Sequence, residues 1–430
     1  MKTKTMKIKD NKLYIGSYSL DELANKYQTP LYIYDECHLR DKISRFVNNF
    51  KDSEFDCKVV YATKAFLAPY LIKILLEYKV FVDAVSAGDL YLLEKANYPM
   101  EMVVLHGNNK SKEELIMAIE KGVGYIVVDN VSELDELIAL SENYKKEIKT
   151  LFRVNPGVEA HTHAFIQTSM LDSKFGESIF DLETIDYIIN SYKKSKYLKL
   201  EGFHAHIGSQ ITNSESFEKE VKVMAKFIKD IEDKYQITLS TLDLGGGFGI
   251  KYLDSDANLE IEDVTALILK TAHSEFKKLG LEIKNLMIEP GRSIVGDAGI
   301  TIYKTRRTKH TFAGVDYAFV DGGMPDNIRP ALYDALYTVV NASRVNGEEG
   351  VYTISGKCCE SGDIIAKGVK ITKPQCDDIL AVFSTGAYCY SMSMNYNGLT
   401  RPGVIFVCDD KITEVIRKET NEELVKTCVF

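Results

Sequence analysis

The sequence predicts an α/β protein: a (β/α)8 barrel of the TIM type joined to an antiparallel β-domain. Eight short runs rich in β-branched residues alternate with intervals that mostly have a helical pattern, which leaves a doubly wound sheet or a barrel. Two further observations favour the barrel. The span from about 58 to 292 has the usual barrel length. A cluster of three glycines follows the seventh run, whereas a dinucleotide-binding sheet would carry it after the first.

The eight runs are the predicted barrel strands. Of the intervals, 214–234 has its apolar side chains at spacings of three and four, as one face of a helix requires, and Asn213 or Ser214 is placed to cap it. The interval 157–178 is instead predicted to be a loop that precedes its helix. In chain order the predicted strands are 58–62, 80–84, 102–105, 125–128, 150–154, 200–206, 239–244 and 285–288.

After residue 293 the pattern changes to short alternating runs separated by turn residues. Examples are "GVYTISGKCC" and "GVIFVCDDKITEVIRKE", which are typical of antiparallel strands. The opening segment "MKIKDNKLYIG" has the same pattern, so we expect its strand to join the β-domain. The predicted division is a barrel over 34–292, inserted between two pieces of the β-domain, 1–33 and 293–430.

Composition argues against several classes of function. The net charge is −9, so no strong positive field would attract nucleic acid or a membrane surface. No apolar run approaches about 20 residues, the length of a membrane span, and the basic N-terminus lacks the apolar segment of a signal peptide. The chain has eight cysteines but no C-x-x-C pair, so the ligand spacing of a metal site is absent and a disulfide framework is not expected. We therefore expect a reducing cytoplasm.

The stretch "VVYATKAF" (59–66) raises a question about one charge. It has the composition of a buried strand, yet Lys64 lies within it. Burying an ammonium group is costly unless its charge is paired or removed. The simpler interpretation places the lysine at the strand end, with its stem on apolar surface and its amine in water. The stretch alone favours that interpretation.

The glycines of "LDLGGGFGI" (242–250) favour a phosphate site over a tight turn. Ile250 occupies the last glycine position of G-x-G-x-x-G, so a dinucleotide fingerprint is not supported. Gly245, Gly246 and Gly247 instead allow backbone N–H groups to converge on an anion. In barrels, phosphate sites commonly lie after strands seven and eight, where this loop and "EPGRS" (289–293) fall.

Other polar residues should face the same mouth of the barrel. His204 and His206 alternate at the end of the sixth run, and no carboxylate ligand accompanies them, which favours stacking on a flat ring over metal binding. Ser209 is placed to donate to a phosphate. With the amine of Lys64 and the carboxylate of Glu289, these groups are what pyridoxal phosphate needs. Lys64 would then be buried, because a lysine bound to this cofactor carries no free ammonium group.

Ten stretches between residues 57 and 405 carry a resemblance to a known family. With them the chain resembles the barrel-fold pyridoxal-phosphate decarboxylases of basic amino acids, most closely the diaminopimelate decarboxylases. The resemblance implies a homodimer that uses pyridoxal 5'-phosphate to convert meso-2,6-diaminopimelate to L-lysine and CO2, the last step of lysine biosynthesis. The stretches are "YATKAF", "NPGVEAHTH", "TSMLDSKFG", "HAHIGSQ", "LDLGGGFGI", "EPGRS", "RPALY", "CCESGD", "GAY" and "NYNGLTRP".

The resemblance also implies the residues that bind the cofactor. Lys64 would form the Schiff base, Glu289 would pair with the pyridine nitrogen, and His206 would stack on the ring. Asp83 matches a carboxylate near the lysine, although a strand-end cap explains it almost as well. Tyr388 matches an aromatic residue that touches cofactor and substrate. The phosphate end would be surrounded by Ser209, Gly245, Gly246, Gly247, Glu289, Pro290, Gly291 and Arg292.

For the substrate, the resemblance implies a composite site. Cys359 matches a proton donor that reaches the site across a dimer interface, and Glu360 matches a carboxylate that holds the substrate's amino group. The chain departs from the family nearby, because Lys357 replaces a frequent proline, Cys389 replaces a smaller residue, and "NYNGLTRP" is altered in its middle. The substrate carboxylate, which a guanidinium can hold bidentately, would contact Arg292, Arg329 and Tyr333.

Three other interpretations compete with this one. A decarboxylase of ornithine, arginine, lysine or carboxynorspermidine would resemble the chain in the barrel, but one acting on a plain diamino acid should carry an acid where Arg329 lies. A binding protein that has lost catalysis should lack Lys64, the glycine loop or Cys359, and all are present. A metal-dependent hydrolase needs clustered histidine and carboxylate ligands, and in the sequence only His204 and His206 come close.

Overall fold

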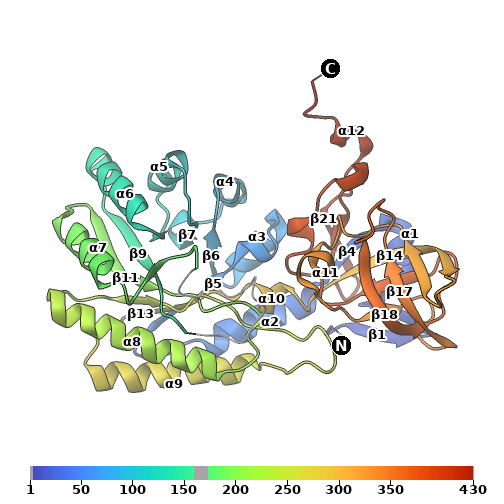
Figure 1. The fold of residues 1–430 in the computed structure, drawn as a ribbon, viewed down its shortest axis with the longest axis horizontal. Helices are drawn as coiled ribbons and strands as arrows, with labels where there is room; N and C mark the ends of the chain where they lie inside the picture. The colour runs from blue at the N-terminus through green and yellow to red at the C-terminus, as the bar shows by residue number, and fades with distance from the viewer. Residues whose placement is uncertain (1–2, 159–172, 430) are drawn as a thin grey trace.

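The computed structural model describes residues 3–158 and 173–429. Within them, eight parallel strands close into a barrel, which confirms the predicted fold and rules out the doubly wound sheet. Figure 1 shows the barrel beside a second, mainly β region. The barrel strands are β5 (Asp56–Tyr61), β6 (Phe81–Ala84), β7 (Val103–Leu105), β8 (Tyr125–Val128), β9 (Ile148–Asn155), β11 (Leu198–His204), β12 (Thr241–Asp243) and β13 (Asn285–Ile288), with the short β10 (Glu177–Ser178) paired to β9.

Two sets of buried side chains explain why the strands close. Five residues from five strands form a separate cluster, while their sequence neighbours, such as Val103 and Leu105, pack in the main core with the helices. This is the two-sided burial of a parallel barrel, in which alternate residues fill the interior. The interior cluster consists of Val60, Val104, Val127, Leu151 and Met287.

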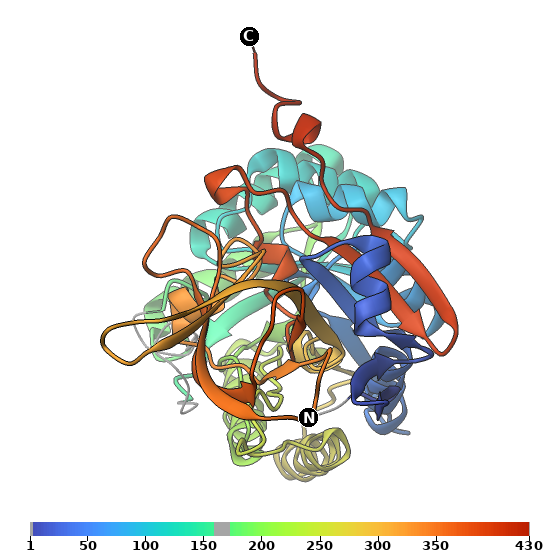
Figure 2. The same cartoon turned by 90° about the vertical axis from the view of Figure 1, so that its right-hand side faces the viewer.

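The helices surround the barrel (Figure 2). The predicted helix over 214–234 is α8 (Glu215–Tyr235), and its cap comes from Asn213, whose Oδ1 accepts the N–H of Ser216 at 3.0 Å, while Ser214 makes no side-chain cap bond. The others around the barrel are α2 (Glu36–Asn49), α3 (Pro69–Glu77), α4 (Ala87–Lys95), α5 (Lys112–Lys121), α6 (Val131–Tyr144), α7 (Leu182–Lys194), α9 (Ile261–Leu279) and the short α10 (Arg292–Val295). The described helices include none that is long and apolar enough to cross a membrane.

The second region is a nine-stranded, mainly antiparallel sheet; its parallel pairs are β15–β17 and β4–β20. The short helices α1 (Leu20–Tyr27), α11 (Arg329–Tyr333) and α12 (Asn421–Leu424) accompany it. Its strands are β4 (Leu31–Asp35), β14 (Gly299–His310), β15 (Asp316–Val320), β16 (Val339–Asn341), β17 (Glu349–Ser355), β18 (Ile364–Thr372), β19 (Ile379–Val382), β20 (Gly403–Cys408) and β21 (Lys411–Ile416).

The opening segment differs in detail from the expectation. It forms the hairpin β1 (Met6–Lys9) and β2 (Lys12–Ile15), which makes a small sheet of its own with β3 (Tyr18–Ser19). Met6, Leu13 and Ile15 nevertheless pack in one core with Ile33 and Ile300 of the large sheet. The N-terminal strand that enters the large sheet is therefore β4, and the division of the chain at 34 and 292 stays a prediction.

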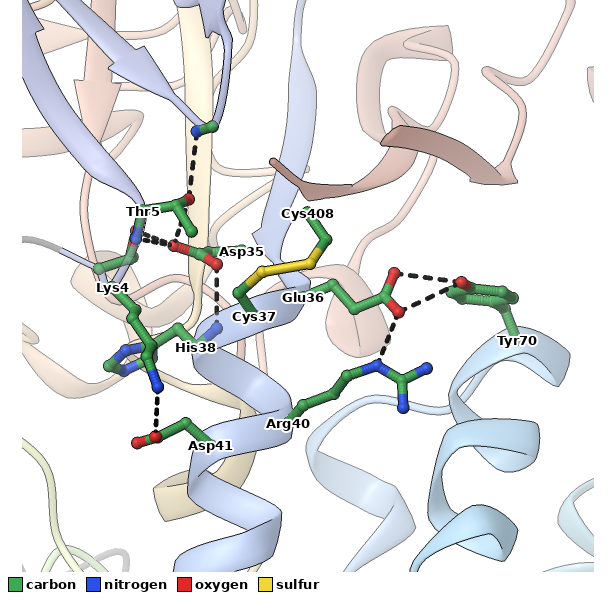
Figure 3. Close-up of a disulfide and its surroundings, with 12 residues drawn as sticks. Lys4, Thr5, Asp35, Glu36, Cys37, His38, Arg40, Asp41, Tyr70 and Cys408 are labelled. Atoms are coloured by element: carbon green, nitrogen blue, oxygen red, sulfur yellow. Dashed lines mark hydrogen bonds and ion pairs between the residues drawn. A yellow bond between two sulfur atoms is a disulfide. The ribbon is translucent and has the colours of Figure 1, made fainter. Parts of the chain in front are cut away.

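A disulfide joins Cys37, in the first turn of α2, to Cys408 at the end of β20, with the two Cα atoms 5.3 Å apart (Figure 3). The expectation that the cysteines would be unpaired is wrong for these two. They meet because β20 runs parallel to β4, with Val407 opposite Asp35, so the residues just beyond that pair are brought together. The sequence could not indicate this, since 371 positions separate the two cysteines.

The pairing predicts a thiol count. Denatured without reductant, the protein should titrate six thiols, and after reduction all eight, because the described residues include all eight cysteines and only Cys37 and Cys408 among them are bonded. Titration with a thiol reagent in denaturant measures both values. A Cys37→Ser chain is the control and should give the same count with and without reductant. Eight thiols in the untreated protein would contradict the pairing.

Candidate active site

A cavity of about 380 Å³ opens at the carboxyl ends of the barrel strands, where barrel enzymes carry their active sites. Segments of the second region complete its wall, including the residues Arg329, Tyr388 and Met392. Most of the predicted site residues line this one cavity. They are Lys64, Asp83, His206, Ser209, Gly246, Gly247, Glu289, Gly291, Arg292, Arg329, Tyr333 and Tyr388.

Lys64 lies in a 3-10 turn, Thr63–Ala65, that directly follows β5. Its side chain is exposed to the cavity rather than buried, so the interpretation of Lys64 as a buried group needs correcting. Both sides of the turn are anchored. The N–H and Oγ1 of Thr63 donate to Asp83 Oδ1 at 2.6 and 2.9 Å, and the carbonyl of Ala65 accepts the N–H of Tyr388 at 2.9 Å. The amine is thus open to a ligand while its backbone is fixed.

Asp83 acts as an anchor for this turn from the neighbouring strand β6. It is buried, and burial raises its pKa against the opposing effect of His106. Because its Oδ1 already accepts two bonds from Thr63, the strand-end cap proposed for it is what the structure contains. The same position also brings its carboxyl group to the cavity wall near Lys64.

Glu289, directly after β13, forms a buried cluster with two histidines. Its Oε1 lies 2.7 Å from His106 Nε2, and its Oε2 lies 3.3 Å from His204 Nε2. Burial alone would raise the pKa of Glu289, but the two imidazoles outweigh it and hold that pKa well below its usual value. Burial lowers the pKa of His204 to about 4. At neutral pH, Glu289 is therefore an ionised carboxylate beside a neutral His204.

His206 presents a neutral ring to the cavity. Its Nδ1 accepts the backbone N–H of Gly246 at 3.1 Å, which leaves the proton on Nε2. Burial lowers the pKa of His206 well below its usual value, and the nearby cations Lys64 and Arg153 act in the same direction. A flat, neutral imidazole fixed by the glycine loop is suited to stacking on another ring.

The glycine loop after β12 approaches its neighbours too closely for any side chain. A Cβ on Gly246 would lie 2.2 Å from the carbonyl oxygen of Glu289, and one on Gly247, where φ is +103°, would lie 2.5 Å from that of Gly208. The N–H of Gly245 donates to Asp243 Oδ1 at 2.9 Å, and that of Gly246 donates to His206. Two of the three N–H groups are thus already used within the protein, which the sequence-based phosphate site did not foresee.

Two buried guanidinium groups lie near the Tyr388 ring. Arg292 Cζ lies 4.7 Å from the ring centroid, and Arg292 Nη2 donates to Ser209 Oγ at 2.9 Å. Arg329 Cζ lies 5.6 Å from the same centroid and 5.2 Å from that of Tyr333. Tyr388 adopts a left-handed backbone, with φ of +59°, a costly conformation for a bulky residue that is concentrated at functional sites.

Four predicted site residues do not line the cavity of the described chain. Gly245 and Pro290 bind lining residues through their backbones: the carbonyl of Gly245 accepts the N–H of Glu289 at 2.6 Å, and that of Pro290 accepts the N–H of Ala62 at 3.3 Å. Cys359 and Glu360 are exposed elsewhere on the same protomer. The stretches "NPGVEAHTH" and "TSMLDSKFG", and with them the predicted loop over 157–178, fall partly outside the described residues.

Two titratable cavity residues were missed at the sequence level. His106 directly follows β7, and Arg153 lies near the end of β9, so both occupy the strand-end positions that led to Lys64 and Glu289. The expectation that no carboxylate accompanies His204 is also wrong, because His106, His204 and Glu289 offer atoms within 4.8 Å of one another. Applying the strand-end rule to all eight strands would have found His106.

Comparison with known proteins decides which chemistry this geometry serves. Residues 37–296, more than half of the chain, match the family model for the pyridoxal binding domain of pyridoxal-dependent decarboxylases. The chain belongs to this family. The decarboxylase is 41% identical to the diaminopimelate decarboxylase of Staphylococcus aureus, over 98% of this chain and 99% of the relative. It is likewise 41% identical to that of Bacillus subtilis, over 96% and 94%.

A solved structure agrees over the whole length. Diaminopimelate decarboxylase from M. jannaschii, in complex with L-lysine, superposes on the decarboxylase with a TM-score of 0.94 at 31% identity. The alignment covers 100% of this chain and 99% of that one. The barrel, the second region and their connection are therefore those of an established decarboxylase fold, and pyridoxal phosphate is the cofactor of the family.

Proposed function

We infer that the protein removes CO2 from meso-2,6-diaminopimelate and forms L-lysine, with pyridoxal phosphate as cofactor. The observation that carries this inference is the pair Arg292 and Arg329 beside Tyr388, in the same cavity as the amine of Lys64. Relatives at 41% identity bear the name of this activity. In the reaction, the carboxylate of the D-configured centre leaves as CO2, its electron pair stays on the carbon, and a proton replaces it.

The residues around the cavity fit pyridoxal phosphate. Its ring supplies the electron sink for the pair left by CO2. Lys64 offers the amine that binds its aldehyde, and Gly246 and Gly247 line the same cavity, where the phosphate would lie. The ionised Glu289 is suited to hold a proton on the pyridine nitrogen, and the neutral His206 to lie on the ring face. Arg292 and Ser209, joined by a hydrogen bond, complete the phosphate end.

The charges of the cavity favour a substrate with a distal carboxylate. Meso-diaminopimelate carries an amine and a carboxylate at both ends, whereas ornithine and lysine carry only an amine at the distal end. A distal ammonium beside Arg292 and Arg329 would be repelled in this partly dry pocket, while a carboxylate is held by charge-assisted hydrogen bonds. Plain diamino acids, the substrates of the runner-up activities, have no distal carboxylate for the two arginines to bind.

We further propose a homodimer with composite sites. Cys359 and Glu360 lie outside the cavity of their own chain, so the proton donor and the amino-group ligand expected of them would come from a second copy. Glu360 would select the D-configured centre, and the L,L isomer should be a poor substrate. The net charge of −9 supports a small-molecule enzyme without a nucleic-acid partner. We also propose a cytoplasmic location on the ground of the biosynthetic relatives alone, because the Cys37–Cys408 disulfide removes the argument from unpaired cysteines.

Mixing two inactive variants tests the composite site. A Lys64→Ala chain and a Cys359→Ala chain each supply what the other lacks, so after subunit exchange about a quarter of the wild-type activity should return if pairing is random. Each mixed dimer then has one intact site of two. Native mass spectrometry confirms that mixed dimers form. If they form and activity stays absent, each site is built from one chain.

Substrate specificity tests the proposed function itself. Protein loaded with pyridoxal phosphate should release L-lysine from meso-diaminopimelate, and it should act slowly or not at all on L-ornithine, L-lysine and L,L-diaminopimelate. Chromatography of the products separates these reactions. Faster turnover of ornithine or lysine would replace the proposal with the runner-up activity.

A further inference from the structure

Arg329 is bound from behind the cavity wall by a second tyrosine. Its Nε donates to the hydroxyl of Tyr337 at 2.9 Å, and both side chains are buried. Tyr337 does not line the cavity formed by the described residues. We propose that Tyr337 is a positioning residue that orients Arg329 for the substrate's distal carboxylate and so contributes to substrate selectivity. This inference rests on the proposed function.

The hydrogen bond restricts which edge of the guanidinium group can bind a ligand. A guanidinium grips a carboxylate with two parallel N–H donors, either from Nε and one Nη or from the two Nη groups. Because the Nε–H of Arg329 already donates to Tyr337, the edge formed by the two Nη groups is left for the substrate. The hydroxyl thus selects one of two binding modes before the substrate arrives.

The aromatic contacts of Arg329 cannot do this alone. Its Cζ lies 5.2 Å from the ring centroid of Tyr333 and 5.6 Å from that of Tyr388. Attraction between a cation and a ring face depends on distance to the ring and weakly on rotation of the guanidinium in its own plane. A directed hydrogen bond fixes that rotation. Tyr337 therefore supplies the restraint that the two rings lack.

Tyr337 is itself held in place by buried neighbours. Its ring packs edge-on against Tyr252, with centroids 5.3 Å apart, and its oxygen lies 3.7 Å from Cys389 Sγ. Burial raises the pKa of Tyr337 well above its usual value, so the hydroxyl stays protonated and neutral. The hydroxyl of Tyr252 accepts a hydrogen bond from Arg292 Nη1. Two packed tyrosines thus connect the two arginines, and the unusual Cys389 lies against one of them.

The test uses Tyr337→Phe in the holoenzyme, which removes the hydroxyl and keeps the ring. KM for meso-diaminopimelate should rise about tenfold, the scale of one lost hydrogen bond to a charged group, while kcat stays within about twofold. The inhibition constant of L-lysine, which retains the distal carboxylate, should rise by the same factor. That of 1,5-diaminopentane, which is L-lysine without its carboxylate, should not change.

Tyr192→Phe is the matched control. Tyr192 is also buried and its hydroxyl lies 2.9 Å from Thr150 Oγ1, but it does not line the cavity, so its loss should alter the melting temperature without changing KM. The proposal is overturned if Tyr337→Phe leaves KM unchanged, or if L-lysine and 1,5-diaminopentane weaken equally. Failure of the proposed function would appear differently, as a wild-type holoenzyme that forms no L-lysine from meso-diaminopimelate.

Discussion

Replacing Lys64 with alanine should abolish decarboxylation and leave the fold intact. The side chain is exposed to the cavity and its turn is held by backbone and side-chain bonds of Thr63 and Ala65, so the substitution removes the reactive amine without opening a gap in the core. Wild-type protein incubated with pyridoxal phosphate should be yellow, and borohydride should fix the pyridoxyl mass on the peptide that contains Lys64. The variant should show neither property.

Lys58→Ala provides the control, because Lys58 lies near the other end of the same strand, where its Nζ binds Asn285 Oδ1 at 2.7 Å. This variant should retain both activity and the pyridoxyl label. Label on a different lysine, or activity that survives Lys64→Ala, would contradict the role given to Lys64.

Replacing Arg329 with alanine should lower kcat/KM for meso-diaminopimelate by about a hundredfold or more. That factor corresponds to ~3 kcal/mol, the scale of one lost hydrogen bond between charged groups. Arg329 is buried in the cavity wall, 5.6 Å from the Tyr388 ring centroid. Steady-state kinetics measures the loss, and the absorbance of the bound cofactor should be unchanged because Arg329 is assigned to the substrate.

Arg344→Ala is the control for removing a partly buried guanidinium group. Arg344 pairs with Asp378 in the second region and does not line the cavity, so this variant should keep the wild-type kcat/KM. If Arg329→Ala also keeps it, or gains activity on meso-diaminopimelate relative to ornithine, the distal carboxylate is bound elsewhere.

The barrel was predictable because its signal is local. Each strand is a short apolar run, and two of the predicted ranges, 125–128 and 285–288, coincide with the strands of the structure. Pairings between distant segments were not predictable in the same way. The opening hairpin forms its own sheet, β4 enters the large sheet instead, and Cys37 meets Cys408. These contacts depend on which distant segments of the chain meet in three dimensions, and composition and periodicity do not specify that.

Much of the candidate site was also predictable, because strand ends and glycines identify one mouth of the barrel. Lys64, His206 and Glu289 line one cavity as expected. The partners of each group were harder to foresee. His106 binds Glu289, and the N–H of Gly246 binds His206 instead of pointing at an anion. Such pairings are set by distances of a few tenths of an ångström between separate strands, and no sequence spacing specifies them.

The most direct test of the central claim is the stoichiometry of one reaction. Holoenzyme should convert meso-diaminopimelate labelled in its carboxyl groups to one L-lysine for each CO2 released, with the label retained only in the remaining carboxylate. That carboxylate is the one assigned to Arg329. The account predicts this result for meso-diaminopimelate and little or no CO2 from L-ornithine or L-lysine. A holoenzyme that releases no CO2 from meso-diaminopimelate, or releases it faster from ornithine, would contradict the account.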